Sequence, residues 1–353
     1  MGSIHKVAAG LVATACLLAT AGCGGDTSGG SGGGADVALL LPGTTGDGGF
    51  IDSAKAGVES AAGESGIKAQ VVEAGTDPTK WQPALDDLIA GDADLIVTGS
   101  FAMADMIQQA AAANPDKRFV IFDGSVNYDK CTCDNVYSIT YHSTQVGFLG
   151  GALAALMAST PGIDKVDPSG TPTIGMVGGQ EIPVIAEYFQ GFKFGAKTVA
   201  PDVKVLTTYV GSFSDPVKGK AVAEDMISQG ADVIEAAAGG TDKGIFEAAA
   251  ANNLWAIGDD KQQLVDPKIG GVDTVLTAAV VDVGNSIKQA VIDWHANTLK
   301  GGTAGVYGVE DGTVSLVESP LYTSVVPPKI QERIKELVAE LKEGKYKEEL
   351  TAS

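Results

Sequence analysis

The stretch ADLIVTGSFAMADMIQQAAAANPDKRFVIFDG, residues 93–124, decides the fold of this chain. It begins with a short aliphatic run, passes through an alanine-rich segment from about Ala102, and ends in a second short apolar run, FVIFDG. Short runs rich in Val, Ile, Leu and Phe are typical of buried strands, and the segment between them has the length of a helix. The stretch therefore predicts two parallel strands joined by a helix.

The same alternation extends in both directions. VALLL and AQVVEA precede the stretch, and VYSITY follows it. After a polar, proline-bearing loop around residues 164–172, the alternation restarts with TIGMVG and continues through VKVLTTYVG, ADVIEAAAGG and LWAIGDD. We predict an α/β fold with two doubly wound lobes, each a parallel sheet with helices on both faces.

The remaining segments return to complete the two lobes. TVLTAAV, a helix near residues 283–296, GTVSLVES and the amphipathic PPKIQERIKELVAELKEGKY read as strand, helix, strand and helix. We assign residues 36–142 and 259–299 to an N-terminal lobe, and residues 143–258 and 300–353 to a C-terminal lobe. A chain that crosses repeatedly between two open sheets predicts a hinge with a cleft.

The N-terminal residues are typical of an export signal. An apolar run of roughly 15 residues follows a short basic start, and it is shorter than the ~20 residues that a membrane-spanning helix needs. TAGC resembles the lipobox of bacterial lipoproteins, although Thr20 stands where Leu is usual. We predict a signal peptide at 1–22, a lipid on Cys23, a Gly/Ser tether at 23–35, and a location on the extracytoplasmic face of the cell membrane. The alternative is an ordinary cleaved signal in which Cys23 is incidental.

Composition excludes several function classes. The chain has 353 residues, with Lys+Arg 24 against Asp+Glu 44, so its formal net charge is −20 and nucleic acid is not an expected partner. Apart from Cys16 in the leader and the predicted anchor Cys23, the cysteines are Cys131 and Cys133 in DKCTCDN, and these two either form a tight disulfide or stay as free thiols. Together with His142 they supply too few ligands for a metal, so we predict no metal and no cofactor.

Enzyme chemistry has little support. The histidines are His5, His142 and His295, and the chain contains neither G-x-S-x-G nor HExxH. AAGGTDKG lacks the ending of a phosphate-binding loop. We predict that the protein is not an enzyme, the alternative being a carboxylate hydrolase in which Asp47 and Asp260 meet across the cleft.

Candidate binding residues follow the predicted strands, where ligands bind in open parallel sheets. The segments GTTGDGGFID, FDGS, VGSFSDP, AAGGTDKG and GDDKQQ combine glycines with aspartates, Phe50 and Phe213. Glycines allow close backbone approach, carboxylates accept from hydroxyl or amino groups, and aromatic faces stack, so we expect a neutral, planar, hydroxylated solute. Alternatively, Asp47, Asp123 and Asp260 are turn or cap residues, and the phenylalanines are core.

At these segments the chain resembles the basic membrane protein family of lipoproteins, which includes the purine nucleoside receptors of bacterial ABC transporters. The resemblance lies in GDGGFIDSAKAGVE, in VGSFSDPVKGKAVAEDMISQGADVIEAAAGGTDKGIFEAA and in WAIGDDKQQ, in this order. It implies a type I periplasmic-binding-protein fold. It also implies a receptor that captures a small nucleoside-like solute and delivers it to an ABC permease.

The resemblance also implies roles for single residues. By position, Phe50 and Phe213 resemble the pair that sandwiches a nucleobase. Asp47 and Asp123 resemble the acceptors for the edge of the base.

Gly240 and Asp260 resemble the ribose contacts. Three positions depart from the family pattern: Gly46 stands where Asn is usual, Ile51 also replaces Asn, and Val281 aligns with a lysine that helps hold the ribose. These departures leave the identity of the ligand open. The sequence also allows a second function, a ligand-binding subunit that reports to a membrane signalling system.

Overall fold

Two six-stranded sheets organise the chain in the computed structural model, which describes residues 2, 35–47, 49–166 and 170–351. The first sheet has the strand order β13-β5-β4-β3-β1-β2, and every neighbouring pair is parallel. Its strands are β1 (Val37–Leu41), β2 (Ala69–Glu73), β3 (Leu95–Gly99), β4 (Arg118–Phe122), β5 (Val136–Tyr141) and β13 (Thr303–Tyr307).

The second sheet has the order β14-β12-β9-β8-β6-β7 and is parallel except for its edge strand β14, which runs antiparallel to β12. A short hairpin of β10 (Lys268–Ile269) and β11 (Val272–Asp273) lies between β9 and β12 in the chain. The strands of the second sheet are β6 (Thr173–Gly178), β7 (Lys204–Tyr209), β8 (Val233–Ala237), β9 (Trp255–Gly258), β12 (Val275–Val281) and β14 (Val314–Leu316).

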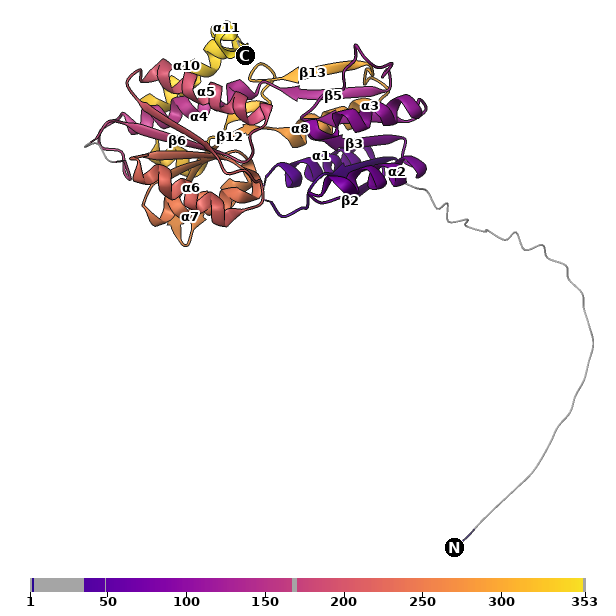
Figure 1. The fold of residues 1–353 in the computed structure, drawn as a ribbon, viewed down its shortest axis with the longest axis horizontal. Coiled ribbons are helices and arrows are strands. Elements are labelled where there is room, and N and C mark those ends of the chain that lie inside the picture. Colours follow the sequence, from indigo (N-terminus) through magenta and orange to yellow (C-terminus); the bar gives the residue numbers. More distant parts are fainter. Residues whose placement is uncertain (1, 3–34, 48, 167–169, 352–353) are drawn as a thin grey trace, which may run out of the picture. The chain divides into compact units, whose positions relative to one another are not determined.

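Helices cover both faces of each sheet (Figure 1). On the first sheet, α1 (Phe50–Ser65) and α8 (Val283–His295) cover one face, while α2 (Trp81–Ala90) and α3 (Ala104–Ala113) cover the other. On the second sheet, α6 (Pro216–Ser228) and α7 (Asp242–Ala251) lie opposite α4 (Ser143–Ala158), α5 (Pro183–Val199) and α10 (Pro328–Lys342). The short helices α9 (Pro320–Val325) and α11 (Lys347–Thr351) complete this lobe. The predicted α/β fold with parallel sheets in two lobes is confirmed.

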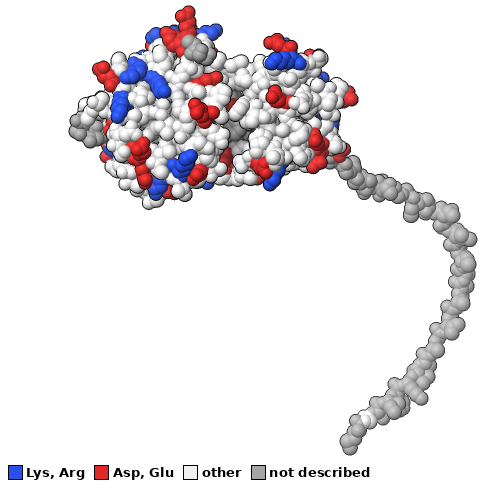
Figure 2. All heavy atoms as spheres, in the orientation of Figure 1, with Lys and Arg blue, Asp and Glu red and all other residues white. Residues whose placement is uncertain are grey.

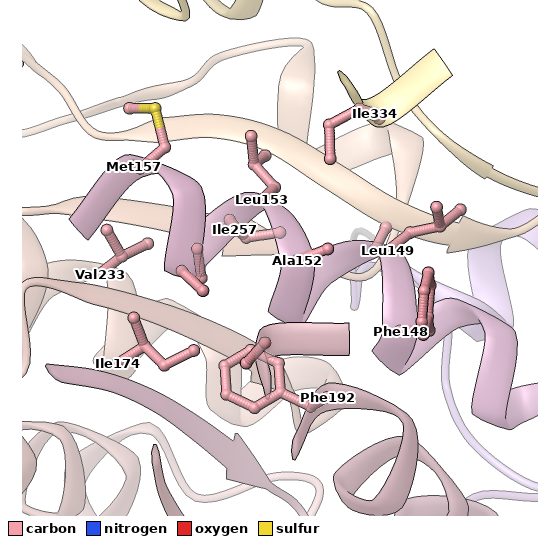
Figure 3. Packing of buried hydrophobic residues seen from close by; sticks show 14 of the residues in the cluster. Phe148, Leu149, Ala152, Leu153, Met157, Ile174, Phe192, Val233, Ile257 and Ile334 are labelled. Carbon is pink, nitrogen blue, oxygen red and sulfur yellow. The ribbon is translucent and has the colours of Figure 1, made fainter. Parts of the chain in front are cut away.

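Helix α4 is buried on nearly all sides, which explains why its sequence is apolar throughout. Figure 3 shows side chains of α4 packed among residues of β6, β8, β9, α5 and α10. Glycines bring α4 against α5: a Cβ built on Gly147 would lie 2.0 Å from the carbonyl oxygen of Tyr188, and one on Gly151 would lie 2.1 Å from that of Phe192. The close helix pair therefore depends on glycine at these positions.

The lobe boundaries expected from the sequence are wrong for two strands. Residues 259–299 were assigned to the N-terminal lobe, but β12 lies in the second sheet beside β9. Residues 300–353 were assigned to the C-terminal lobe, but β13, which the sequence did not predict, pairs with β5 in the first sheet. Local apolar runs predict strands, whereas long-range pairing decides the sheet in which each strand lies.

The predicted signal peptide, the tether and Cys23 lie outside the described residues. None of the helices in the described part of the chain has both the length and the apolar character needed to cross a bilayer. On the face drawn in Figure 2, acidic and basic side chains are interspersed among uncharged residues.

Candidate functional site

The candidate residues follow the carboxyl ends of strands in both sheets. Asp47 follows β1 and Asp123 follows β4 in the first sheet. Phe213 follows β7, Gly240 lies in the short 3-10 helix η3 (Gly239–Thr241) after β8, and Asp260 follows β9 in the second sheet. This is the edge at which open parallel sheets bind ligands.

The loop after β1 approaches the loops after β8 and β9. Lys243 Nζ, in the first turn of α7, donates to the backbone carbonyl of Gly46 at 3.4 Å. A Cβ built on Gly49 would lie 3.7 Å from Cβ of Asp260. The structure therefore brings the Asp47 loop of the first sheet next to the Asp260 loop of the second.

The Asp47 carboxylate binds the backbone at the start of α1, whose N-cap residue is Gly49. Its carboxylate accepts from the backbone N–H groups of Gly49 at 3.0 Å, Ile51 at 3.0 Å and Asp52 at 3.2 Å. An ionised carboxylate has about four acceptor sites, so these bonds use most of its capacity. In this structure Asp47 therefore has the capping role that the sequence analysis gave as an alternative to ligand binding.

Phe50 and Phe213 are both half-buried. Phe50 is the first residue of α1, and its ring centroid lies 5.5 Å from that of Phe122. The ring of Phe213 lies against Gly179, where a built Cβ would be 2.3 Å from Cδ1 of the ring. Both rings therefore have core contacts on one side and remain partly exposed, which is compatible with either stacking or a core role.

Asp123 occupies an unusual backbone conformation at the end of β4. Its φ of 52° lies in the left-handed region, which Asp adopts more readily than most residues. Burial raises the pKa of Asp123 to about 7, and the carboxylate of Glu187 on α5 adds to the rise. Such perturbed groups in strained conformations are common at functional sites.

Asp260 is 8% exposed and caps the 3-10 helix η4 (Lys261–Leu264), where its carboxylate accepts from the N–H of Gln262 at 2.8 Å. Burial raises the pKa of Asp260 to about 6, while the Gln262 hydrogen bond lowers it and the Asp47 carboxylate raises it. The carboxylate is mostly ionised at neutral pH and is therefore an acceptor.

Two buried acids that the sequence reading did not single out lie beside these loops. Asp242 is the first residue of α7, and Asp259 immediately precedes Asp260. The side-chain amide of Gln263 donates to both carboxyls. The D-x-x-Q spacing of Asp260 and Gln263 is a capping-box pattern that was readable in the sequence, whereas the contact with Asp242 was not.

Val281 ends β12 at the point where the chain leaves the second sheet. It is half-buried and packs against hydrophobic clusters of both lobes. The Nζ of Lys261 lies 2.5 Å from Asp282 Oδ2, so this lysine is paired with a carboxylate next to Val281. Val281, Lys261 and Asp260 line one side of a cavity of about 250 Å³ between η4, α1 and α8.

Cys131 and Cys133 form a disulfide with an S–S distance of 2.03 Å. Cys131 also lines a cavity of about 550 Å³ beside α3, and none of the candidate binding residues lines it. Within the described ranges, no three His, Cys, Asp or Glu side chains are placed to hold a metal ion.

Comparisons with known proteins show the family to which the chain is similar. Residues 35–347 match the Bmp family, described as ABC transporter substrate-binding protein PnrA-like. The chain is 30% identical over 288 residues to basic membrane protein A of Borreliella burgdorferi, covering 80% of this chain and 79% of that protein. It is 33% identical over 229 residues to the ABC transporter nucleoside-binding protein BmpA of Lactococcus lactis, covering 61% of each chain.

Solved structures show the same fold. An ABC transporter solute-binding protein from Aeropyrum pernix K1 has a TM-score of 0.76 and 25% identity, covering 88% of this chain and 91% of that chain. One from Conexibacter woesei has a TM-score of 0.69 and 24% identity, covering 88% and 96%. From the match over residues 35–347 and the shared fold, this chain belongs to the Bmp family of PnrA-like ABC transporter substrate-binding proteins.

Proposed function

We propose that this protein is an extracytoplasmic lipoprotein that binds a nucleoside-like ligand and delivers it to an ABC import permease. The observation that carries the ligand class is the placement of Phe50 and Phe213. Both are half-buried aromatic rings: Phe50 begins α1 after β1 of the first sheet, and Phe213 lies in the loop after β7 of the second sheet. The nucleoside-binding name of the Lactococcus lactis relative supports the same class.

In this proposal the two rings stack on the base and Asp123 accepts hydrogen bonds from its edge. Because the pKa of Asp123 is about 7, a ligand that donates to this carboxylate stabilises its ionised form and releases part of a proton on binding. Asp47 acts mainly through α1, since it already accepts three backbone hydrogen bonds that fix the position of Phe50 at the start of that helix.

Asp260 and the backbone at Gly240 contact the sugar. Asp260 accepts from a ribose hydroxyl, because its carboxylate is mostly ionised at neutral pH. A Cβ built on Gly240 would lie 3.4 Å from the carbonyl oxygen of Phe213, so this stretch of backbone lies beside the residue that carries the stacking ring. The apolar side chain of Val281 cannot donate a hydrogen bond to the ribose. The ribose therefore contributes less to the free energy of ligand binding.

The two lobes close on the ligand in this proposal. The chain passes between the sheets where β5 leads into α4, where β12 leads into α8, and after β13. Short crossings of this kind can absorb the rotation of a hinge. Small-angle scattering with and without ligand tests closure: a smaller radius of gyration supports it, and an unchanged radius at saturation contradicts it.

A lipid on Cys23 holds the receptor beside its permease. The Gly/Ser-rich residues that follow give the domain reach, and acylation adds roughly 0.8 kcal/mol per buried methylene, so that more than one chain is needed for a stable anchor. Disulfide formation between Cys131 and Cys133 agrees with an oxidising extracytoplasmic location.

Native mass spectrometry of the purified protein tests the ligand class directly. We expect a retained mass that corresponds to a nucleoside or a related heterocycle, and titration calorimetry with adenosine, guanosine and their free bases should then show binding. An amino acid or a sugar in the retained mass, with no heat from any nucleoside or base, would refute the proposed ligand.

A further inference from the structure

Gln263 joins two buried carboxyls through its side-chain amide. Its Nε2 donates to Asp259 Oδ1 at 2.7 Å and to Asp242 Oδ2 at 3.0 Å. Its Oε1 accepts from the backbone N–H of Asp259 at 2.9 Å and of Asp260 at 3.3 Å. All four hydrogen bonds are directed at groups that flank the proposed sugar contacts.

The same network reaches the end of β8. Asp242 Oδ1 accepts from the backbone N–H of Ala238 at 2.9 Å. Gly240 lies between Ala238 and Asp242, so the η3 turn is tied at both ends. Through Gln263 this turn is connected to the Asp260 loop, and the relative position of the two loops depends on the network.

Neither carboxyl forms an ion pair with a basic side chain among the described residues. Asp242 is 1% exposed. The basic residues close to the pair in sequence have other partners: Lys261 pairs with Asp282, and Lys243 donates to the carbonyl of Gly46. The titratable groups that face the pair are Asp47, Tyr188, Glu235 and Asp260.

All of these neighbours are acids, so they favour a protonated pair. Burial raises the pKa of Asp259 to about 7, and the Asp260 carboxylate adds to the rise. Burial also raises the pKa of Asp242 well above its usual range, and the adjacent Asp259 carboxyl reinforces this. Two carboxyls in contact without a cation are stable when one proton lies between them.

We propose that Asp242 and Asp259 share one proton and, joined by Gln263, act as the positioning unit of the ligand site. The unit holds the turn that carries Gly240 beside the loop that carries Asp260. This inference rests on the proposed function, because its role is to place the proposed sugar contacts. None of the three side chains is assigned a direct contact with the ligand.

Loss of the shared proton changes the charge of the pair from −1 to −2, and the proton passes to solvent. Because the folded-state pKa values lie above the usual value of 3.8, the stabilisation is complete below that value and is lost as the pH rises through the folded values. Repulsion between the two carboxylates then separates the loops. Ligand affinity should therefore fall as the pH rises through the folded pKa values of the pair.

Asp259→Asn is the informative variant. Asn has the same shape, its oxygen still accepts from Gln263, and its amide can donate to Asp242 without a shared proton. Asp87→Asn, at an exposed position on α2, is the matched control. Adenosine binding is measured by titration calorimetry, and the melting temperature is measured without ligand, both from about pH 5 to about pH 9.5.

For the parent and the Asp87→Asn variant, we expect the Kd for adenosine to rise towards tenfold per pH unit at the alkaline end, and the ligand-free melting temperature to fall. For Asp259→Asn, we expect the Kd to change by less than about threefold over the range and the melting temperature to fall less. Equal slopes in the parent and in Asp259→Asn would overturn the proposal.

Two further results keep the outcome decisive. If no nucleoside binds at any pH, the proposed function fails, but the ligand-free melting curves still report on the pair. If Asp259→Asn does not fold, the ¹³C carboxyl resonances of Asp-labelled parent protein decide: two side chains that titrate in separate, elevated steps support a shared proton, and two ordinary titrations contradict it.

Discussion

Phe213→Ala tests the stacking that defines the proposed ligand class. The Phe213 ring is half-buried, with one side against Gly179, and it follows β7 at the edge where the other candidate residues lie. Base–aromatic stacking contributes roughly 1–3 kcal/mol per base, so removing the ring should raise the Kd by about 5-fold to 150-fold. Phe50→Ala should have an effect of similar size if both faces of the base are used.

Titration calorimetry with adenosine measures this effect, and Phe101→Ala is the control. Phe101 also follows a strand of the first sheet, but it is 46% exposed and belongs to no proposed contact. We expect Phe101→Ala to bind adenosine like the parent. Because the Phe213 ring also packs on the core, thermal unfolding must first show that the variant is folded at the temperature of the titration.

If Phe50→Ala and Phe213→Ala are folded and bind adenosine with the Kd of the parent, these rings are core residues. The carried-over stacking role would then be wrong, and the ligand class would lose its main structural support.

Four other predictions test the sugar contact, the lipid anchor, the helix packing and Asp123. Val281→Lys should raise affinity for ribonucleosides over their free bases by about 10-fold to 150-fold, because a charge-assisted hydrogen bond contributes about 1.5–3 kcal/mol; an unchanged ratio in calorimetry would show that other residues hold the ribose. Cys23→Ala should release the protein into the medium, and fractionation that still finds it on the membrane would place the anchor elsewhere. Gly147→Ala should lower the free energy of unfolding by about 1–3 kcal/mol, since its Cβ would meet the Tyr188 carbonyl at 2.0 Å, whereas Gly63→Ala, which meets nothing within 4 Å, should raise it by up to about 1 kcal/mol in denaturant titrations. In Asp123→Asn, the melting temperature should fall less between about pH 5 and about pH 8 than it does in the parent. The stabilisation that comes from the raised pKa of Asp123 is complete below 3.8 and is lost as the pH rises through about 7. Identical melting profiles of the two proteins would mean that Asp123 has an ordinary pKa.

Much of the fold could be read from local patterns. Runs such as VALLL and TIGMVG became β1 and β6 because a buried parallel strand needs a short, continuous apolar segment. The apolar segment after VYSITY became α4, which begins at Ser143. The positions of Asp47, Asp123 and Asp260 at strand ends also followed, because strand ends are visible in the sequence.

The tertiary structure decided what depends on distant contacts. TAGVY became the edge strand β13 because it pairs with β5. Its side chains are exposed or half-buried, and the segment lacks the continuous apolar run that predicts a buried strand. Asp242 and Asp259 are separated in the chain by α7 and β9, and only the packing of these elements brings both to the amide of Gln263. Their raised pKa values come from burial beside other acids, and burial of this kind is created by the whole fold and not by neighbouring residues in the chain.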